Sequence, residues 1–314
     1  MPFPTKLITT LKAHQGACHT LTYSTGGAYI LTGGSDRAIN LFNSTSHALV
    51  NTYSKGHGYE ILSLAVSQNN NTFISGGGDR AVLLWDVQSG KYLRRWSEHG
   101  GRVNAVAFAG EGGNETTGLE SVVVSASFDT KVRFFDLKAS GTKPIQMLEE
   151  AKDSVGCLAI RGSEVYTGSV DGRMRCYDIR MGCVYTDVVG PPVTSLSLTV
   201  DGTGVLAGTL DSTLRLFDRA SGGLLQTFKG GHKNDEYRIE SCLGVSDHYV
   251  VTGSEDGYMV AYDLLEGRMV ERVKAYKEGV EEKRKVLACV KVHPRGKQAV
   301  TAGVDGSLMI FGEA

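Results

Sequence analysis

The sequence has few of the features that mark several large classes of protein. Its 314 residues include 6 prolines against 40 glycines, a ratio that favours many tight turns over disorder. The net charge is −1, so the chain lacks the basic excess of a general polyanion binder. No apolar run approaches the length of a membrane span, and the first residues, MPFPTKLITTLKAH, lack the apolar core of a signal peptide. We therefore expect an intracellular globular protein without membrane contact.

Cysteine is also scarce, and it never occurs in a C-x-x-C pair. Five of the six cysteines lie in apolar or strand-like segments, so we expect buried free thiols and neither disulfides nor a metal site. The six are Cys18, Cys157, Cys176, Cys183, Cys242 and Cys289. The run Gly76-Gly77-Gly78 imitates a dinucleotide-binding loop, but a strand follows it where that loop requires a helix. The sequence thus predicts no cofactor and no metal.

The chain does contain a sevenfold repeat. Residues 72–86, TFISGGGDRAVLLWD, form an apolar strand, a glycine-rich turn with Asp79, and a second apolar strand that ends at Trp85. Six residues separate that Asp from the aromatic residue, and the spacing recurs as Asp36 to Phe42, Asp129 to Phe135, Asp171 to Tyr177, Asp211 to Phe217, Asp256 to Tyr262 and Asp305 to Phe311. Successive aspartates lie 43, 50, 42, 40, 45 and 49 residues apart. This is the period of one four-stranded propeller blade.

The residues three and five positions after each turn aspartate are apolar in all seven copies. Because side chains two residues apart share one face of a strand, these residues form an apolar face that a neighbouring sheet must cover. The sequence therefore predicts an all-β fold, a seven-bladed β-propeller, as a single domain over residues 1–314. The predicted repeats are 13–53, 54–96, 97–148, 149–187, 188–228, 229–273 and 274–314.

Residues 1–12 contain a strand that precedes the first repeat, whereas the last repeat has only three strands of its own. We predict that Lys6 to Leu11 pairs with Ser307 to Phe311 and closes the ring. This pairing removes the open sheet edges that an incomplete last blade would leave.

A set of polar residues accompanies the turn aspartate, and repeat two has all of them: His57, Ser75, Asp79 and Trp85. A carboxylate in a largely buried turn needs nearby donors, so we predict a hydrogen-bonded network within the blade. The other members are His14, Thr32 and Asp36 in repeat one, His99, Ser125 and Asp129 in repeat three, His232, Thr252 and Asp256 in repeat six, and Asp171, Asp211 and Asp305 in repeats without an aligned histidine. We expect those last three blades to be held by packing more than by a polar network.

Gly56-His57, Ser75, Asp79 and Trp85-Asp86 resemble the signature of the WD-repeat family. This resemblance implies a WD40 propeller in which the His, the hydroxyl, the Asp and the Trp form the intrablade network. Longer blocks, namely KGHGYEIL (55–62), SGGGDRAVLLWDVQSGK (75–91), LEEAKDSV (148–155), GSVDGRMRCYDIRMG (168–182), LDSTLRLFD (210–218) and GGHKNDEYRIESC (230–242), resemble mitogen-activated protein kinase organizers, which are small seven-bladed WD-repeat proteins. The similarity spans blades one to six and weakens in the last blade.

The resemblance implies a non-enzymatic scaffold for kinase-cascade components that is also part of catalytically active spliceosomes in pre-mRNA splicing. It implies a cytoplasmic and nuclear location, a monomeric propeller within larger assemblies, and an indirect association with RNA. Residues in the loops beside the turn aspartates are the candidate partner-binding residues: Tyr59, Glu60, Arg102, Phe128, Asp153, Leu210, Tyr237, Arg238 and Glu255. An exposed aromatic residue there is a plausible hot spot for binding.

Two alternatives remain open on the sequence. Arg133, Arg175 and Arg215 stand four residues after their aspartates in successive repeats, either as a stripe for RNA or an acidic partner, or as stems that cover a blade edge. The box Tyr177-Asp178-Ile179-Arg180 resembles the W-D-x-R box of substrate receptors of cullin ubiquitin ligases, with Arg180 as the candidate contact. Two insertions, 110–120 and 276–285, are mixed in charge and are predicted to be solvated loops.

Overall fold

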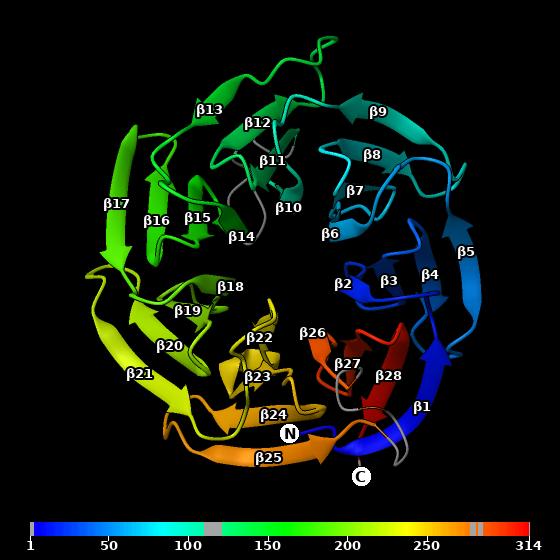
Figure 1. Ribbon diagram of the computed structural model, residues 1–314, viewed down its shortest axis with the longest axis vertical. Coiled ribbons are helices and arrows are strands. Elements are labelled where there is room, and N and C mark those ends of the chain that lie inside the picture. Colours follow the sequence, from blue (N-terminus) through cyan, green and yellow to red (C-terminus); the bar gives the residue numbers. More distant parts are fainter. Residues whose placement is uncertain (1–2, 110–120, 277–280, 282–284, 314) are drawn as a thin grey trace.

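Seven antiparallel four-stranded sheets stand around a central axis like the blades of a propeller (Figure 1). The computed structural model describes residues 3–109, 121–276, 281 and 285–313. The predicted all-β, seven-bladed propeller is confirmed. The two loops predicted at 110–120 and 276–285 lie outside the described residues, apart from Tyr276, Glu281 and Lys285.

The strands of each blade follow one another along the chain from the axis outwards. Blade one comprises β2 (Cys18–Tyr23), β3 (Tyr29–Gly34), β4 (Ile39–Asn43) and β5 (Leu49–Tyr53). Blade two comprises β6 (Ile61–Val66), β7 (Thr72–Gly77), β8 (Val82–Asp86) and β9 (Tyr92–Trp96). Blade three comprises β10 (Val103–Phe108), β11 (Val122–Ser127), β12 (Val132–Asp136) and β13 (Gln146–Leu148).

Blade four comprises β14 (Val155–Arg161), β15 (Glu164–Ser169), β16 (Arg173–Asp178) and β17 (Cys183–Val188). Blade five comprises β18 (Val193–Leu198), β19 (Gly204–Thr209), β20 (Thr213–Asp218) and β21 (Leu224–Lys229). Blade six comprises β22 (Ser241–Leu243), β23 (Tyr249–Thr252), β24 (Tyr258–Asp263) and β25 (Met269–Lys274). A short 3-10 helix, η1 (Val245–Asp247), precedes β23.

Blade seven joins the two ends of the chain. Its inner strands are β26 (Leu287–Val292), β27 (Gln298–Gly303) and β28 (Ser307–Gly312), and its outer strand is β1 (Lys6–Lys12). β1 runs antiparallel to β28 from the pair Lys6 and Gly312 to the pair Lys12 and Ser307, as Figure 1 shows for the blue and red strands. The predicted closure is confirmed, and it pairs the edge of β28 that would otherwise be open.

The apolar face of each blade is buried against its neighbour. In blade two, Phe73 stacks on Trp85 with ring centroids 5.8 Å apart, and Tyr53 of blade one packs edge-on against Phe73 at 4.9 Å. All three rings are buried. Of the fourteen apolar residues at the third and fifth positions after the turn aspartates, all are buried except the partly buried Cys176. The seven apolar layers therefore hold adjacent blades together.

The cysteines are free, as expected, but they are not all buried. Four are buried, Cys176 is partly buried, and Cys183 on β17 is exposed, contrary to the expectation of buried thiols. Cys183 begins an outer strand, where no further strand covers it. Burial raises the pKa of the Cys18 and Cys157 thiols to about 12, so both are protonated at neutral pH.

The antiparallel order places two kinds of connection at each end of the blades. The turns between second and third strands, which carry the repeated aspartates, lie at the same end as the links from each outer strand to the next inner strand. We call this end the aspartate face. The remaining turns form the opposite face.

Candidate functional site

Blade two contains a continuous chain of hydrogen bonds. Trp85 Nε1 donates to Ser75 Oγ over 2.8 Å, and Ser75 Oγ lies 2.7 Å from His57 Nε2. His57 Nδ1 lies 2.8 Å from Asp79 Oδ1. These contacts are mutually satisfied when Ser75 donates to the imidazole and the imidazole donates to Asp79. The network ties the outer link, the second strand and the turn of the blade to one another.

The turn aspartates of blades one to five have pKa values below the ordinary value of a carboxyl group. Burial acts to raise the pKa of Asp79, but the hydrogen bonds from His57 and from the Gly58 amide outweigh it. The same balance lowers the pKa of Asp36, Asp129, Asp171 and Asp211. Each of these carboxylates is therefore ionised in the folded protein at neutral pH.

Blades one and three contain the same network without tryptophan. His14 bridges Asp36 and Thr32, each at 2.9 Å, and His99 bridges Asp129 and Ser125. In blade three Arg133 adds an ion pair to Asp129 at 2.7 Å.

Blades four and five lack the histidine, but in each of them an arginine makes polar contacts to the turn aspartate. The expectation that packing holds these blades more than a polar network does stays a prediction. Arg175 donates to both oxygens of Asp171, at 3.3 and 2.6 Å, and Arg215 does the same with Asp211, at 3.3 and 2.7 Å. Arg175 is buried and Arg215 is partly buried. The register places these guanidinium groups beside their own turn aspartates. Arg133, Arg175 and Arg215 therefore form internal ion pairs and no exposed stripe for RNA.

Blade six departs from its predicted network. His232 Nδ1 lies 2.7 Å from the Tyr262 hydroxyl, and within the described part of the chain the imidazole forms no hydrogen bond with Thr252 or Asp256. Asp256 pairs with Arg272 at 2.6 Å. Tyr262, in the position of Trp85, brings its hydroxyl to His232 Nδ1, the ring nitrogen that contacts the carboxylate in blades one to three.

Blade seven also has a donor for its aspartate, which the sequence analysis missed. The Tyr276 hydroxyl donates to Asp305 Oδ1 over 3.0 Å, and Ser307 donates to the same oxygen. Tyr276 stands 29 residues before Asp305, outside the 22-residue spacing of the histidines in blades one and two. Only the folded chain shows that its ring reaches the turn.

Apart from Arg180, the candidate partner-binding residues that are exposed lie on the aspartate face. Tyr59 has 63% of its surface exposed and Phe128 has 55%. The Arg102 guanidinium lies 5.2 Å from the centre of the Phe128 ring, so the two form one exposed cation–π pair. Tyr237 and Asp153 are also exposed, on the links into blades six and four.

Other candidates have internal roles. Glu255 is buried, and its Oε1 accepts the backbone N–H groups of Asp235, Glu236 and Tyr237. It shapes the link into blade six and is not available to a partner. Leu210 and Glu60 are partly buried in their turns. Arg180 is exposed, but it lies between β16 and β17 on the opposite face, away from the other candidates.

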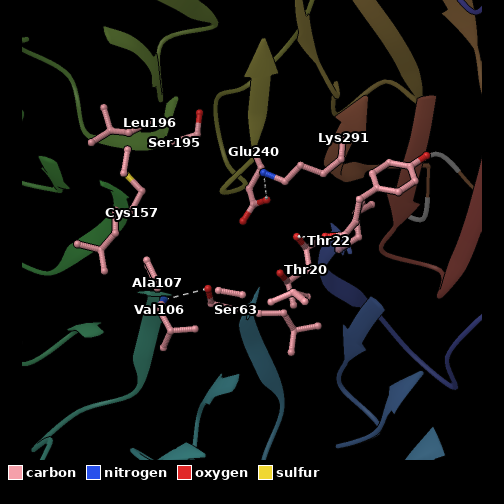
Figure 2. A pocket seen from close by; sticks show the side chains of 18 of the residues that line it. Thr20, Thr22, Ser63, Val106, Ala107, Cys157, Ser195, Leu196, Glu240 and Lys291 are labelled. Atoms are coloured by element: carbon pink, nitrogen blue, oxygen red, sulfur yellow. Dashed lines mark hydrogen bonds and ion pairs between the residues drawn. The ribbon is translucent and has the colours of Figure 1, made fainter. Parts of the chain in front are cut away.

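Arg238 lies at the central channel and does not project from the rim. Its Nη1 donates to the Asn104 carbonyl of blade three over 2.9 Å, and its Nη2 lies 3.7 Å from Glu240. The channel has a volume of about 550 Å³ and is lined by the inner strands of all seven blades. Figure 2 shows Lys291 and Glu240, from adjacent blades, pointing toward each other at one side of the channel, with Lys291 Nζ 3.5 Å from Glu240 Oε2. Hydroxyl groups such as those of Thr20, Thr22 and Ser63 complete the polar lining.

No feature of the described residues resembles a reaction centre. The histidines with carboxylate partners are buried and bonded on both ring nitrogens in blades one to three. Within the described ranges no three His, Cys, Asp or Glu side chains gather in a way that would hold a metal ion. In the same part of the chain, no helix is long and apolar enough to cross a bilayer. The fold and its polar network define a WD-repeat β-propeller that presents loops on a rigid ring.

Comparison with known proteins agrees with this class. Residues 182–218 match the family model described as WD domain, G-beta repeat, and residues 7–140 match the tRNA methyltransferase TRM82 WD40 domain. The chain belongs to the WD-repeat family and, within it, to the group of WD repeat domain-containing protein 83.

Several relatives carry that name, and three of them show the range of similarity. The Homo sapiens protein is 43% identical over 266 residues, which cover 85% of this chain and 81% of the relative. The Danio rerio protein is 36% identical over 309 residues, covering 98% and 92%. The Dictyostelium discoideum homolog is 28% identical over 334 residues, covering 97% of both chains.

Proposed function

We propose that this propeller is a non-enzymatic adaptor that assembles protein complexes through its aspartate face. The observation that carries the proposal is the group of exposed aromatic side chains there, Tyr59, Phe128 with Arg102, and Tyr237. Aromatic and arginine side chains dominate the energetics of protein interfaces. The loops that carry them are tied to buried networks, so little conformational entropy is lost on binding.

The partners that we propose are kinase-cascade components and spliceosome proteins, in the cytoplasm and the nucleus. The support is the resemblance of six sequence blocks to mitogen-activated protein kinase organizers. Several of these blocks lie on the aspartate face: residues 55–60 precede β6, residues 149–154 precede β14, and residues 230–240 precede β22. A partner that recognises the blocks would meet the same face that carries the exposed rings.

The experiment is affinity purification of the tagged chain with mass spectrometry, comparing the wild type with a Tyr59→Ser and Phe128→Ser double variant. We expect the two substitutions to remove specific partners, because both side chains are exposed and their loss leaves the fold intact. The matched control is Tyr92→Ser, an exposed ring on the outer strand β9. If the double variant retains the partners of the wild type, binding through the aspartate face is contradicted. If a cullin adaptor is recovered and its recovery requires Arg180, the ubiquitin-ligase alternative is favoured.

One comparison favours a second candidate function. Residues 7–140, which include blades one and two, match the WD40 domain of a tRNA methyltransferase component. We propose, as the alternative, a non-catalytic WD-repeat subunit that supports an RNA-modifying enzyme through protein contacts. Co-purification of a methyltransferase subunit would support it. Arg133, Arg175 and Arg215 are not proposed as its RNA contacts, because all three are bound to aspartates.

A further inference from the structure

Blade four differs from the other six blades at one position of its outer strand. The position is the one that pairs with the third residue after the turn aspartate. Its occupant is apolar in six blades, where it is Tyr53, Trp96, Leu148, Phe228, Val273 or Leu11. In blade four it is Asp187, paired with Met174.

Two residues away on the same face of the outer strand, the difference between blade four and the other blades is the opposite: an aromatic residue replaces a polar one. The outer-strand residue that pairs with the fifth residue after the aspartate is polar in six blades, where it is Asn51, Arg94, Gln146, Gln226, Glu271 or Thr9. In blade four it is Tyr185, with 62% of its surface exposed. Blade four thus has a carboxylate where the others have an apolar side chain, and an aromatic ring where the others are polar.

In the other blades these two positions help to fill the gap to the next blade. Tyr53, Trp96 and Phe228 are buried there, and the Tyr53 hydroxyl donates to the Val87 carbonyl of blade two. The Arg94 guanidinium donates to the carbonyls of Asp136 and Ala139 in blade three. The same two positions therefore contact the next blade after blades one and two, and a smaller cavity of about 330 Å³ remains beside Asn51.

Between blades four and five the gap is open. It forms a cavity of about 530 Å³ in which Asp187 and Tyr185 face β19, β20 and the turn that follows β20. Gly222 in that turn lies directly against the Asp187 carboxylate, and any side chain there would collide with it. Among the described residues, Asp187 has no hydrogen-bond or ion-pair partner.

The cavity has an excess of negative charge. Its lining includes the carboxylates of Glu164, Asp178, Asp187 and Asp218 and one guanidinium, Arg219. Arg219 is already bound to Glu164 at 2.9 Å and to the Gly202 carbonyl at 2.8 Å. Asp178 and Asp218 accept backbone amides of their own turns. Of the four carboxylates, Asp187 is the one that has neither a cation nor a donor within the described ranges.

We propose that this cavity binds a lysine or arginine side chain of a partner protein. Asp187 would form the ion pair, and the exposed Tyr185 ring two residues away on the same face would hold the cation or its stem. The position of Asp187 is filled by an apolar side chain in the other six blades, so blade four loses packing there. A bound basic side chain would fill the gap between blades four and five. Burial raises the pKa of Asp187, and an incoming cation would reverse that shift.

The proposal rests on the adaptor function, but its test is independent of the aspartate face. The test measures the binding of a dye-labelled (Gly-Arg)4 peptide by fluorescence polarisation. We expect the wild type to bind this peptide and not its (Gly-Gln)4 counterpart. Asp187→Asn keeps the size of the side chain but removes its charge and should weaken binding at least fivefold, and Tyr185→Ser should do the same. The matched control is Glu271→Gln, a carboxylate at the Tyr185 position of blade six, and its affinity should equal that of the wild type.

A second variant separates binding from folding. Asp187→Phe places in blade four the residue that Phe228 provides in blade five, so we expect a higher melting temperature together with loss of peptide binding. Equal affinity of the wild type and Asp187→Asn for the arginine peptide would overturn the proposal, as would retained binding in Asp187→Phe. The Phe128→Ser variant should bind the peptide normally, so a failure of the adaptor proposal on the aspartate face is distinguishable from a failure here.

Discussion

The clearest test of the polar network is the loss of Asp79. Its side chain is only 7% exposed and accepts hydrogen bonds from His57 Nδ1, the amides of Gly58 and Ala81, and Arg95. Asp79→Ala leaves the buried imidazole and the buried turn without their acceptor. Breaking a buried charged contact from one side costs roughly 3–5 kcal/mol, so we expect the free energy of unfolding to fall by about 4 kcal/mol. For a chain of this size that corresponds to a melting temperature lower by about 6 °C.

Asp211 is the comparison within the same fold. Its side chain is 32% exposed and its partners are Arg215 and Thr209. Because a partly exposed ion pair contributes about 1 kcal/mol, Asp211→Ala should lower the melting temperature by about 1.5 °C. Circular dichroism melts and urea titrations of both variants, with Glu98→Ala as an exposed control, give the two values. Equal losses for Asp79→Ala and Asp211→Ala would refute the argument that burial and donor number set the strength of the network.

Four further predictions concern the closure of the ring and the polar contacts of the blades. Deletion of residues 1–12 removes β1 and exposes the edge of β28, so the truncated chain should melt earlier and less cooperatively and should self-associate in gel filtration; a truncated chain as stable as the intact one would contradict the closure. Tyr276→Phe removes the donor to Asp305 and should lower the free energy of unfolding by about 1–2 kcal/mol, as measured by urea titration, whereas Tyr29→Phe, on an exposed ring, should have no effect. Stability should fall as the pH falls below the ordinary carboxyl value of 3.8, because the folded pKa values of Asp36, Asp79 and Asp129 are depressed and protonation there favours the unfolded chain. His232 adds a loss between pH 6.5 and about 4, since burial lowers its pKa to about 4 and only the unfolded chain takes up the proton in that range; in His232→Gln this part of the urea-midpoint profile should flatten.

The polar network shows where prediction from the sequence succeeded and where it failed. Identical spacing in blades one and two placed His14 and His57 beside their aspartates, and the structure has both contacts. The network of blade seven was missed because its donor, Tyr276, is a different residue type at a different spacing. The sequence analysis left open whether Arg175 and Arg215 form a surface stripe. In the structure, a residue four positions after a turn aspartate, on the strand that follows the turn, lies beside that aspartate.

The sequence by itself determined the number of blades, the strand order and the closure of the ring. Those features depend on local periods: an aspartate in a tight turn, apolar residues two apart, and a repeat length that fits four strands. The tertiary structure alone decided which side chains are free to act. It buried Glu255 under three backbone amides, drew Arg238 into the channel, and placed Asp187 between two blades with no partner among the residues that the structure describes. The pairing of Glu255 and of Arg238 depends on neighbours 18 and 134 residues away along the chain, and no local pattern in the sequence records such distances.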